Sequence, residues 1–182
     1  MTLELLKVNK NNLALRIAME HHYSHPNGFV GRSICYGVFY NSECFGFIVG
    51  GSSTKHLPGR DEFFNNTHLD NIVNNTFFHI SKNDTKYPIR NFVPKVISQW
   101  RKQIIQDWPD KFDGDKVIGF ETLVELPRTG ECYLRDGWKL VGQTKGFTCK
   151  RIGGVGTDSW GGKRVWDLDN LRPKRVLVRF AD

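Results

Sequence analysis

The chain has 182 residues, of which 39% are hydrophobic and 13% aromatic, and its net charge is +7 at pH 7. This composition is typical of one globular domain and excludes a disordered chain. No apolar stretch approaches the roughly 20 residues that a membrane-spanning helix needs. The first ten residues lack the apolar core of a signal peptide. We therefore expect a cytoplasmic protein.

The cysteines lie far apart and form no C-x-x-C pair; they are Cys35, Cys44, Cys132 and Cys149. This spacing excludes the common zinc-ribbon pattern, and it gives no disulfide framework in a reducing compartment. Buried free thiols are therefore expected.

Three structured stretches are predicted in the first 70 residues. Residues 2–20 favour a short strand followed by a helix, with Asn11 or Asn12 as the N-cap. Residues 33–49 alternate β-forming side chains around the sequence NSE, which indicates a β-hairpin. Residues 51–70 are polar and irregular, with one short helical or 3₁₀ piece.

The middle of the chain holds the strongest helix signal. Residues 75–80 predict a compact strand, and residues 92–108 predict a long helix whose apolar side chains recur every three or four positions. Pro94 falls in the first turn of this helix, where a missing N–H does no harm. The apolar stripe consists of Val93, Ile97, Trp100, Ile104 and Trp108.

The remaining elements complete a mixed architecture. Residues 116–125 predict a central strand, followed by a short helix over 130–137 and a final hairpin over 138–151. Together the elements predict an α/β fold with a mixed, mainly antiparallel sheet flanked by helices. We assign residues 1–149 to one domain and residues 150–182 to a basic, glycine-rich C-terminal extension packed on or near it.

The last 33 residues carry eight Lys or Arg against four Asp, and Trp160, Trp166 and Phe180 are interleaved with them. Basic residues mixed with aromatic residues suit a polyanion with flat bases, because phosphates attract cations and bases stack on rings. An ordinary solvated surface is the alternative. The candidate DNA-contacting residues are Lys145, Lys150, Arg151, Lys163, Arg164, Arg172, Lys174 and Arg175.

The segment HHYSH, residues 21–25, places three imidazoles and a phenol just after the first predicted helix. Histidine titrates near physiological pH and is the commonest metal ligand. The cluster by itself leaves open a metal site, a catalytic site or a set of polar loop residues.

The order strand, loop, long helix, buried strand and then YLRDGW at 133–138 resembles the GNAT acyltransferase fold, whose last element reads Y-x-x-x-G-F. The resemblance implies that Tyr133 protonates the departing thiolate as a general acid. It also implies that the loop before the long helix binds the pyrophosphate of acyl-coenzyme A. Residues 81–92 contain no glycine, unlike that family's phosphate loop. Either the donor is held in another way, or it is not acyl-coenzyme A.

A narrower resemblance covers about residues 20–147. HYSH, YGVFYNSECFGFIVGG and LVELPRTGECYLRDGWKLVGQTKG are similar to segments of phage Mom proteins, which modify adenine in DNA. VNNTFF at 73–78 and ETLVE at 121–125 are similar to the DruA domain of Druantia anti-phage systems. Both resemblances imply the same GNAT-like fold.

The Mom resemblance implies a catalytic cluster of His22, Tyr23 and Glu125. His22 and Glu125 could share a metal such as iron, or act as a base and an orienting acid on an exocyclic amine. Arg90, Asn91 and Ser98 fall where that family has polar residues on the donor side, so they are the candidate cofactor-binding residues.

The function implied is transfer of a carbamoylmethyl group to N6 of adenine in phage DNA, which protects that DNA from restriction. The partner would be double-stranded DNA in the host cytoplasm, without a membrane, and a homodimer is compatible with this hypothesis. The alternatives are a non-catalytic DNA-binding module of DruA type and a conventional GNAT N-acetyltransferase.

Overall fold

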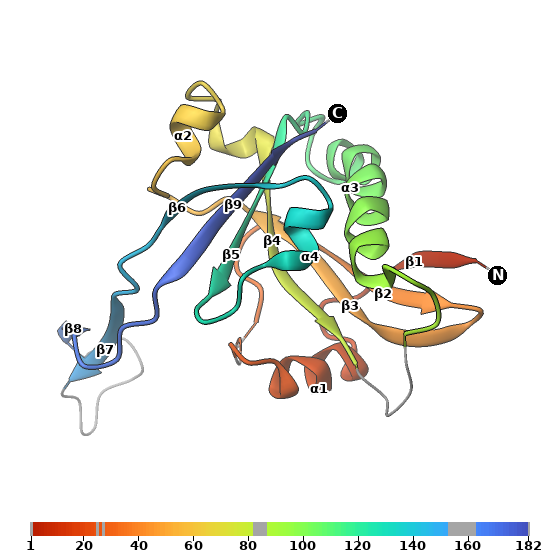
Figure 1. The fold of residues 1–182 in the computed structure, drawn as a ribbon, viewed down its shortest axis with the longest axis horizontal. Helices are drawn as coiled ribbons and strands as arrows, with labels where there is room; N and C mark the ends of the chain where they lie inside the picture. Colours follow the sequence, from red (N-terminus) through yellow and green to blue (C-terminus); the bar gives the residue numbers. More distant parts are fainter. Residues whose placement is uncertain (1, 25, 27, 82–86, 153–162, 182) are drawn as a thin grey trace.

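The computed structural model describes residues 2–24, 26, 28–81, 87–152 and 163–181, with the backbone alone for 148–152 and 163–164. Among these residues, seven strands form one mixed sheet in the order β1-β2-β3-β4-β5-β9-β6, and β7 pairs with β8 (Figure 1). The strands are β1 (Leu3–Val8), β2 (Ser33–Tyr40), β3 (Glu43–Ser52), β4 (Ile72–Ile80), β5 (Gly119–Glu125), β6 (Lys139–Gln143), β7 (Thr148–Ile152), β8 (Lys163–Asp167) and β9 (Lys174–Phe180). The helices are α1 (Leu13–His21), α2 (Arg60–Phe63), η1 (Leu69–Asn71), α3 (Phe92–Lys111) and α4 (Glu131–Arg135).

The predicted N-terminal elements are confirmed, and local chemistry explains them. The Asn12 side chain caps α1 by accepting the N–H of Leu15 at 3.1 Å. Asn41 and Ser42 both have positive φ, 49° and 69°, at the turn between β2 and β3. Such a turn follows the natural twist of a two-stranded hairpin, so it fixes the register of β2 against β3.

Helices α1 and α3 cover opposite faces of the sheet (Figure 1). Tyr36 of β2 belongs to the core beneath α3, whereas its neighbour Cys35 packs with Leu15 of α1. This follows from the strand period of two, which sends successive side chains to opposite faces.

The apolar stripe predicted for α3 is confirmed, because Ile97, Trp100, Ile104 and Trp108 are fully buried and Val93 packs at their edge. Gly50 of β3 lets the helix approach this closely. An added Cβ there would lie 2.2 Å from Cδ1 of Ile104.

The C-terminal part differs from the prediction in two respects. The prediction of a final hairpin over 138–151 is wrong, because β6 pairs with β9 and β7 pairs with β8. Residues 174–180, which we assigned to the extension, form β9 between β5 and β6 in the main sheet. The apolar residues 176–178 account for this, because they are fully buried in the sheet. Their burial lowers the free energy of the fold more than an exposed position in a basic extension would.

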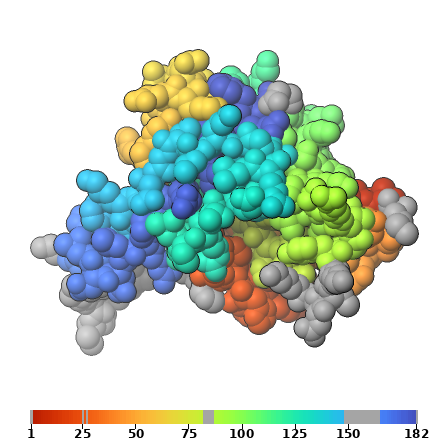
Figure 2. All heavy atoms as spheres, viewed as in Figure 1, coloured from red at the N-terminus to blue at the C-terminus, as the bar shows by residue number. Residues whose placement is uncertain are grey.

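The pair β7–β8 projects from the rest of the molecule (Figures 1 and 2). We call residues 147–152 and 163–172 the arm. Trp166 on the arm is 65% exposed, and its ring contacts Phe147 with 5.9 Å between the centroids. In the part of the chain that the structure describes, no helix is long and apolar enough to cross a membrane.

Candidate active site

The parallel strands β4 and β5 pair along only part of their length. Their register covers three residue pairs, from Ile72 opposite Gly119 to Asn74 opposite Glu121. Beyond these pairs, β4 remains paired with β3 and β5 with β9, so the two strands separate (Figure 1). We call this gap the opening. Because backbone N–H and C=O groups need partners, the strand edges that face the opening can take an extended ligand.

A cavity of about 530 Å³ occupies the opening. Its walls come from β4, β5, the residues after α1, the turn before α4, α4 itself and the first residue of β9. This volume suits a small-molecule site, and its place at the carboxyl ends of parallel strands is a common place for one.

Asn75 forms the floor of the cavity at an irregularity in β4. Val49 of β3 lies opposite Phe77 and Gly50 lies opposite Asn75, so Thr76 has no partner and β4 bulges. The Asn75 amide donates to the carbonyls of Val49 at 3.1 Å and Phe77 at 3.3 Å. The bulge and its amide therefore fix the strand where it turns away from β5.

Tyr133 lies on the cavity wall and donates its hydroxyl hydrogen to Oδ1 of Asn75 at 2.6 Å. It also packs edge-on against Trp138, with 5.1 Å between the ring centroids. Burial raises the pKa of Tyr133 well above its ordinary value. The phenol therefore stays protonated, and its hydrogen is directed to Oδ1 of Asn75.

His22 is buried at the end of α1, whereas its neighbour His21 is exposed. Nδ1 of His22 accepts the N–H of Ser24 at 3.3 Å and lies 2.8 Å from Oγ of Ser24. In the tautomer that these contacts favour, Nδ1 accepts hydrogen bonds and Nε2 carries the proton. The basic atom of His22 therefore faces Ser24, which lines the cavity.

Tyr23 packs between two neighbours. Its ring lies 4.2 Å from that of His22, and the Arg128 guanidinium carbon lies 3.7 Å from its centroid. Burial raises the pKa of Tyr23, while the charge of Arg128 and the N–H of Glu125 act to lower it. His22 and Tyr23 thus both line the cavity.

Glu125 ends β5 and interacts with Tyr23, but it is not part of the cavity wall. The structure therefore places two of the three predicted residues in the cavity and the third beside them. Within the described residues, no group of three His, Cys, Asp or Glu side chains could hold a metal ion, so iron has no support. His25 lies outside the described residues.

The predicted donor-side residues separate into two places. Arg90 is exposed and Asn91 is the N-cap of α3, with the left-handed backbone angles φ 58° and ψ 32°. Asparagine adopts this conformation more readily than other residues with a side chain. Ser98 lines a separate hollow with Leu3 and Tyr40. Residues 82–86 of the loop lie outside the described residues.

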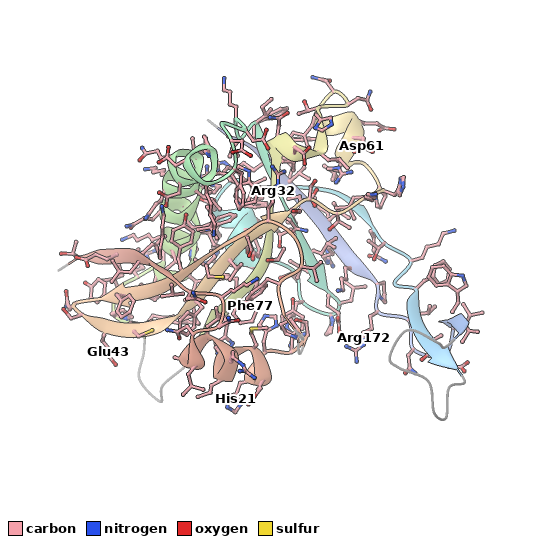
Figure 3. All side chains as sticks on the ribbon, turned by 180° about the vertical axis from the view of Figure 1, so that it is seen from behind. His21, Arg32, Glu43, Asp61, Phe77 and Arg172 are labelled. Carbon is pink, nitrogen blue, oxygen red and sulfur yellow. The ribbon has the colours of Figure 1, made fainter. Side chains whose placement is uncertain are left out.

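The candidate DNA-contacting residues are also dispersed. Lys174 lines the cavity and Arg175 is half-buried in β9. Lys145 is exposed, and so is Arg172, which lies near the base of the arm (Figure 3). The remaining side chains lie outside the described part of the structure: Lys150, Arg151, Lys163 and Arg164.

Sequence analysis did not single out Asn75, Ser24 or Arg128. Two adjacent asparagines inside an apolar strand were a usable signal for Asn75, because a buried amide needs specific partners. The position of Arg128 over Tyr23 had no signal, since it depends on how two distant segments meet.

No protein-family profile matches the chain, and no curated protein does. Solved structures do match. Aminoglycoside acetyltransferase AAC(6′)-Ib, in complex with coenzyme A and kanamycin, superposes with a TM-score of 0.60 at 12% identity, over 98% of this chain and 95% of that one. A Bacillus subtilis acetyltransferase in complex with coenzyme A superposes with a TM-score of 0.56 at 12% identity, over 98% of this chain and 99% of that one. A GNAT-family acetyltransferase from Elizabethkingia anophelis with acetyl-coenzyme A bound has a TM-score of 0.51 at 11% identity, over 98% of this chain and 97% of that one.

The fold is that of the GNAT acetyltransferases. This confirms the predicted fold class, and at such low identity it shows the fold alone. The finer resemblances to Mom and DruA gain no support from these comparisons. In the GNAT fold of this chain, the opening between β4 and β5 is the candidate active site.

Proposed function

We propose that this protein is an acyl-coenzyme A-dependent N-acyltransferase that works in the opening between β4 and β5. The observation that carries the proposal is the separation of this parallel pair after three residue pairs, with a cavity at the point of separation. Two of the similar structures contain coenzyme A and a third contains acetyl-coenzyme A, which supports this choice of donor.

The residues present fit such a donor. Acyl-coenzyme A has an extended arm with amide groups, for which the edges of β4 and β5 offer main-chain partners. Arg90 and the first N–H groups of α3 would hold its pyrophosphate, because a helix N-terminus attracts anions. When bound, the donor supplies an activated thioester.

His22 and Ser24 would remove the proton from the acceptor nitrogen. Oγ of Ser24 lines the cavity and lies 2.8 Å from Nδ1 of His22. Ser24 accepts the proton at Oγ while its own hydroxyl proton passes to Nδ1. The net result is a protonated imidazole, so His22 acts as the base through Ser24.

Tyr133 would pass to the departing thiolate the hydroxyl hydrogen that otherwise bonds Oδ1 of Asn75, and the phenolate would regain a proton from solvent. Its hydroxyl lies on the cavity wall and is protonated at all physiological pH values, because burial raises its pKa. The bond to Asn75 fixes the orientation of Oη. This role agrees with the general acid that the GNAT resemblance implies.

Thermal unfolding with and without acetyl-coenzyme A, in the absence of DNA, tests the proposal. We expect the midpoint to rise with donor concentration, since a ligand that binds only the folded state stabilises it. Arg90→Gln should weaken this effect, while the matched Ser98→Ala variant, altered in the separate hollow, should retain it. An unchanged midpoint across all donor concentrations would refute the proposal.

A second candidate is the Mom-type reaction, transfer of a carbamoylmethyl group to N6 of adenine in DNA. The arm favours it, because the exposed Trp166 offers a surface on which a base can stack. His22 and Glu125 would then serve the adenine amine, which must leave the base stack to be reached.

Mass spectrometry of nucleosides from plasmid DNA co-expressed with the protein tests this candidate. Modified adenine that disappears in His22→Ala would support it. DNA binding that weakens in Trp166→Ala without any modified adenine would instead favour the non-catalytic DruA-type alternative.

A further inference from the structure

Positively charged side chains outnumber negatively charged ones on the cavity wall. Three charged side chains line it, Arg128, Lys174 and Glu131. Glu131 forms a salt bridge with Arg135, at 2.9 Å between Oε1 and Nε, so its charge is compensated from outside the cavity. Neither Arg128 nor Lys174 forms a salt bridge with any residue that the structure describes. Two cations that form no salt bridge with the described residues therefore line the cavity.

These two cations belong to segments that are held together. Leu126 donates its N–H to the carbonyl of Pro173 at 3.1 Å, which ties the turn that carries Arg128 to the start of β9. Lys174 is the next residue, and it lies opposite Glu125 in the sheet. Glu125 is the nearest other carboxylate in the sheet register, and it is not part of the cavity wall. Glu125 forms no salt bridge with Lys174 among the described residues, so the ammonium group remains available to a ligand.

The aromatic ring of Tyr23 packs against the arginine. The guanidinium of Arg128 lies over the ring of Tyr23, which restrains its plane and leaves its N–H edges available. A guanidinium binds two oxygens of one anion as a fork, and an ammonium binds a further oxygen as a point charge. A phosphate has three free oxygens and up to two negative charges, which match two cations, whereas a carboxylate has two oxygens and one charge.

We infer that the amine acceptor of this cavity carries a phosphate group, which Arg128 and Lys174 bind. The inference rests on the proposed N-acyltransferase function and names its substrate class. It excludes acceptors with several ammonium groups, because these would meet two cations of like charge. Arg128 and Lys174 are binding residues in this scheme, while His22, Ser24 and Tyr133 move protons.

Two matched pairs of acceptors test the inference with acetyl-coenzyme A as the donor. Phosphoethanolamine is compared with ethanolamine, and 5′-dAMP with deoxyadenosine. We expect kcat/KM to be at least about 10-fold higher for the phosphorylated member of one pair, since a hydrogen bond to a charged group contributes about 1.5–3 kcal/mol. The pair that shows the preference tells whether the amine is aliphatic or belongs to a nucleotide base.

The variants Arg128→Gln and Lys174→Gln should each remove most of this preference by raising KM, with kcat little changed. Lys139→Gln is the matched control, because Lys139 is exposed on β6 and does not line the cavity. Equal rates for phosphorylated and neutral acceptors, or a preference that survives in both variants, would overturn the inference.

Binding of the phosphorylated compounds without a donor separates this inference from the proposed function. If acetyl-coenzyme A stabilises the protein but neither 5′-dAMP nor phosphoethanolamine binds more tightly than its neutral partner, the inference alone fails. If acetyl-coenzyme A has no effect, the proposed function fails, whatever the phosphorylated compounds do.

Discussion

The two ends of the β4–β5 pair are built in opposite ways. At the closed end the strands are hydrogen-bonded, and the Arg60 guanidinium meets the Glu121 carboxylate at 2.7 Å with both side chains almost fully buried. At the open end the strands separate, and Asn75, Tyr133 and Ser24 face a cavity. The closed end thus anchors the strands through buried charge, so that the open end can remain apart.

The closed end is connected to the cavity through Thr54. Its N–H donates to Glu121 at 2.6 Å, and its hydroxyl accepts the amide of Asn74 at 2.9 Å. Burial raises the pKa of Glu121, although the hydrogen bonds from Arg60 and Thr54 act to lower it. The ion pair therefore depends on both donors, and we expect it to be sensitive to the loss of either partner.

Breaking the closed end should have the largest effect. Glu121→Gln leaves the buried Arg60 charge with only the half-exposed Asp61 as its counter-charge, so we expect the free energy of unfolding to fall by about 3–5 kcal/mol in urea titrations. Asp61→Asn is the control, because Asp61 contacts the same guanidinium with a half-exposed side chain and should cost about 1 kcal/mol or less. Equal losses in both variants would contradict the anchoring role.

Substitutions at the open end should lower kcat and change the free energy of unfolding little. Ser24→Ala removes the hydroxyl between the cavity and Nδ1 of His22, so we expect kcat to fall by about 10²-fold, and by up to about 10⁴-fold in His22→Ala. His21→Ala, at the exposed neighbouring histidine, should leave kcat within about twofold. Equal losses of kcat in His21→Ala and His22→Ala would argue against the relay.

Tyr133 contributes to both the stability of the fold and the chemistry of the cavity, so a variant at this position should affect both. Tyr133→Phe leaves Oδ1 of Asn75 without its donor, and we expect a loss of about 1–3 kcal/mol in the free energy of unfolding together with a fall in kcat. Tyr36→Phe is the matched control, since the buried Tyr36 donates to Asp107 at 2.8 Å beneath α3. It should lose similar stability and keep kcat; if it loses kcat as well, the effect of Tyr133→Phe is structural.

The smallest effect concerns two thiols. Burial raises the pKa of Cys132, which lines the cavity, to about 11, so very little thiolate is present at pH 8. We expect iodoacetamide at pH 8 to label the exposed Cys44 and to spare Cys132, with labelling of Cys132 increasing as the pH approaches 11. Peptide mass spectrometry measures both sites in one sample. Equal labelling at pH 8 would mean that the open end admits more water than the structure indicates.

The two asparagines at 74 and 75 show where sequence patterns reach their limit. The strand predicted over 75–80 includes only Asn75, whereas β4 begins at Ile72 and includes both. Adjacent strand residues point to opposite faces, and each amide has a different role. One is bonded to Thr54 at the closed end, and the other holds Tyr133 at the open end. No local pattern distinguishes these roles, because both partners are distant in the chain.

The sequence by itself determined the elements whose signals are local. The cap at Asn12, the turn at Asn41 and Ser42 and the apolar stripe of α3 each depend on residues a few positions apart. The tertiary structure decided what depends on distant segments: β9 enters the sheet between β5 and β6, β4 separates from β5 at Asn75, and Arg128 meets Tyr23. The physical reason is that side-chain periodicity specifies which face of an element is buried, whereas strand pairing is chosen by the total burial and hydrogen bonding of the whole sheet.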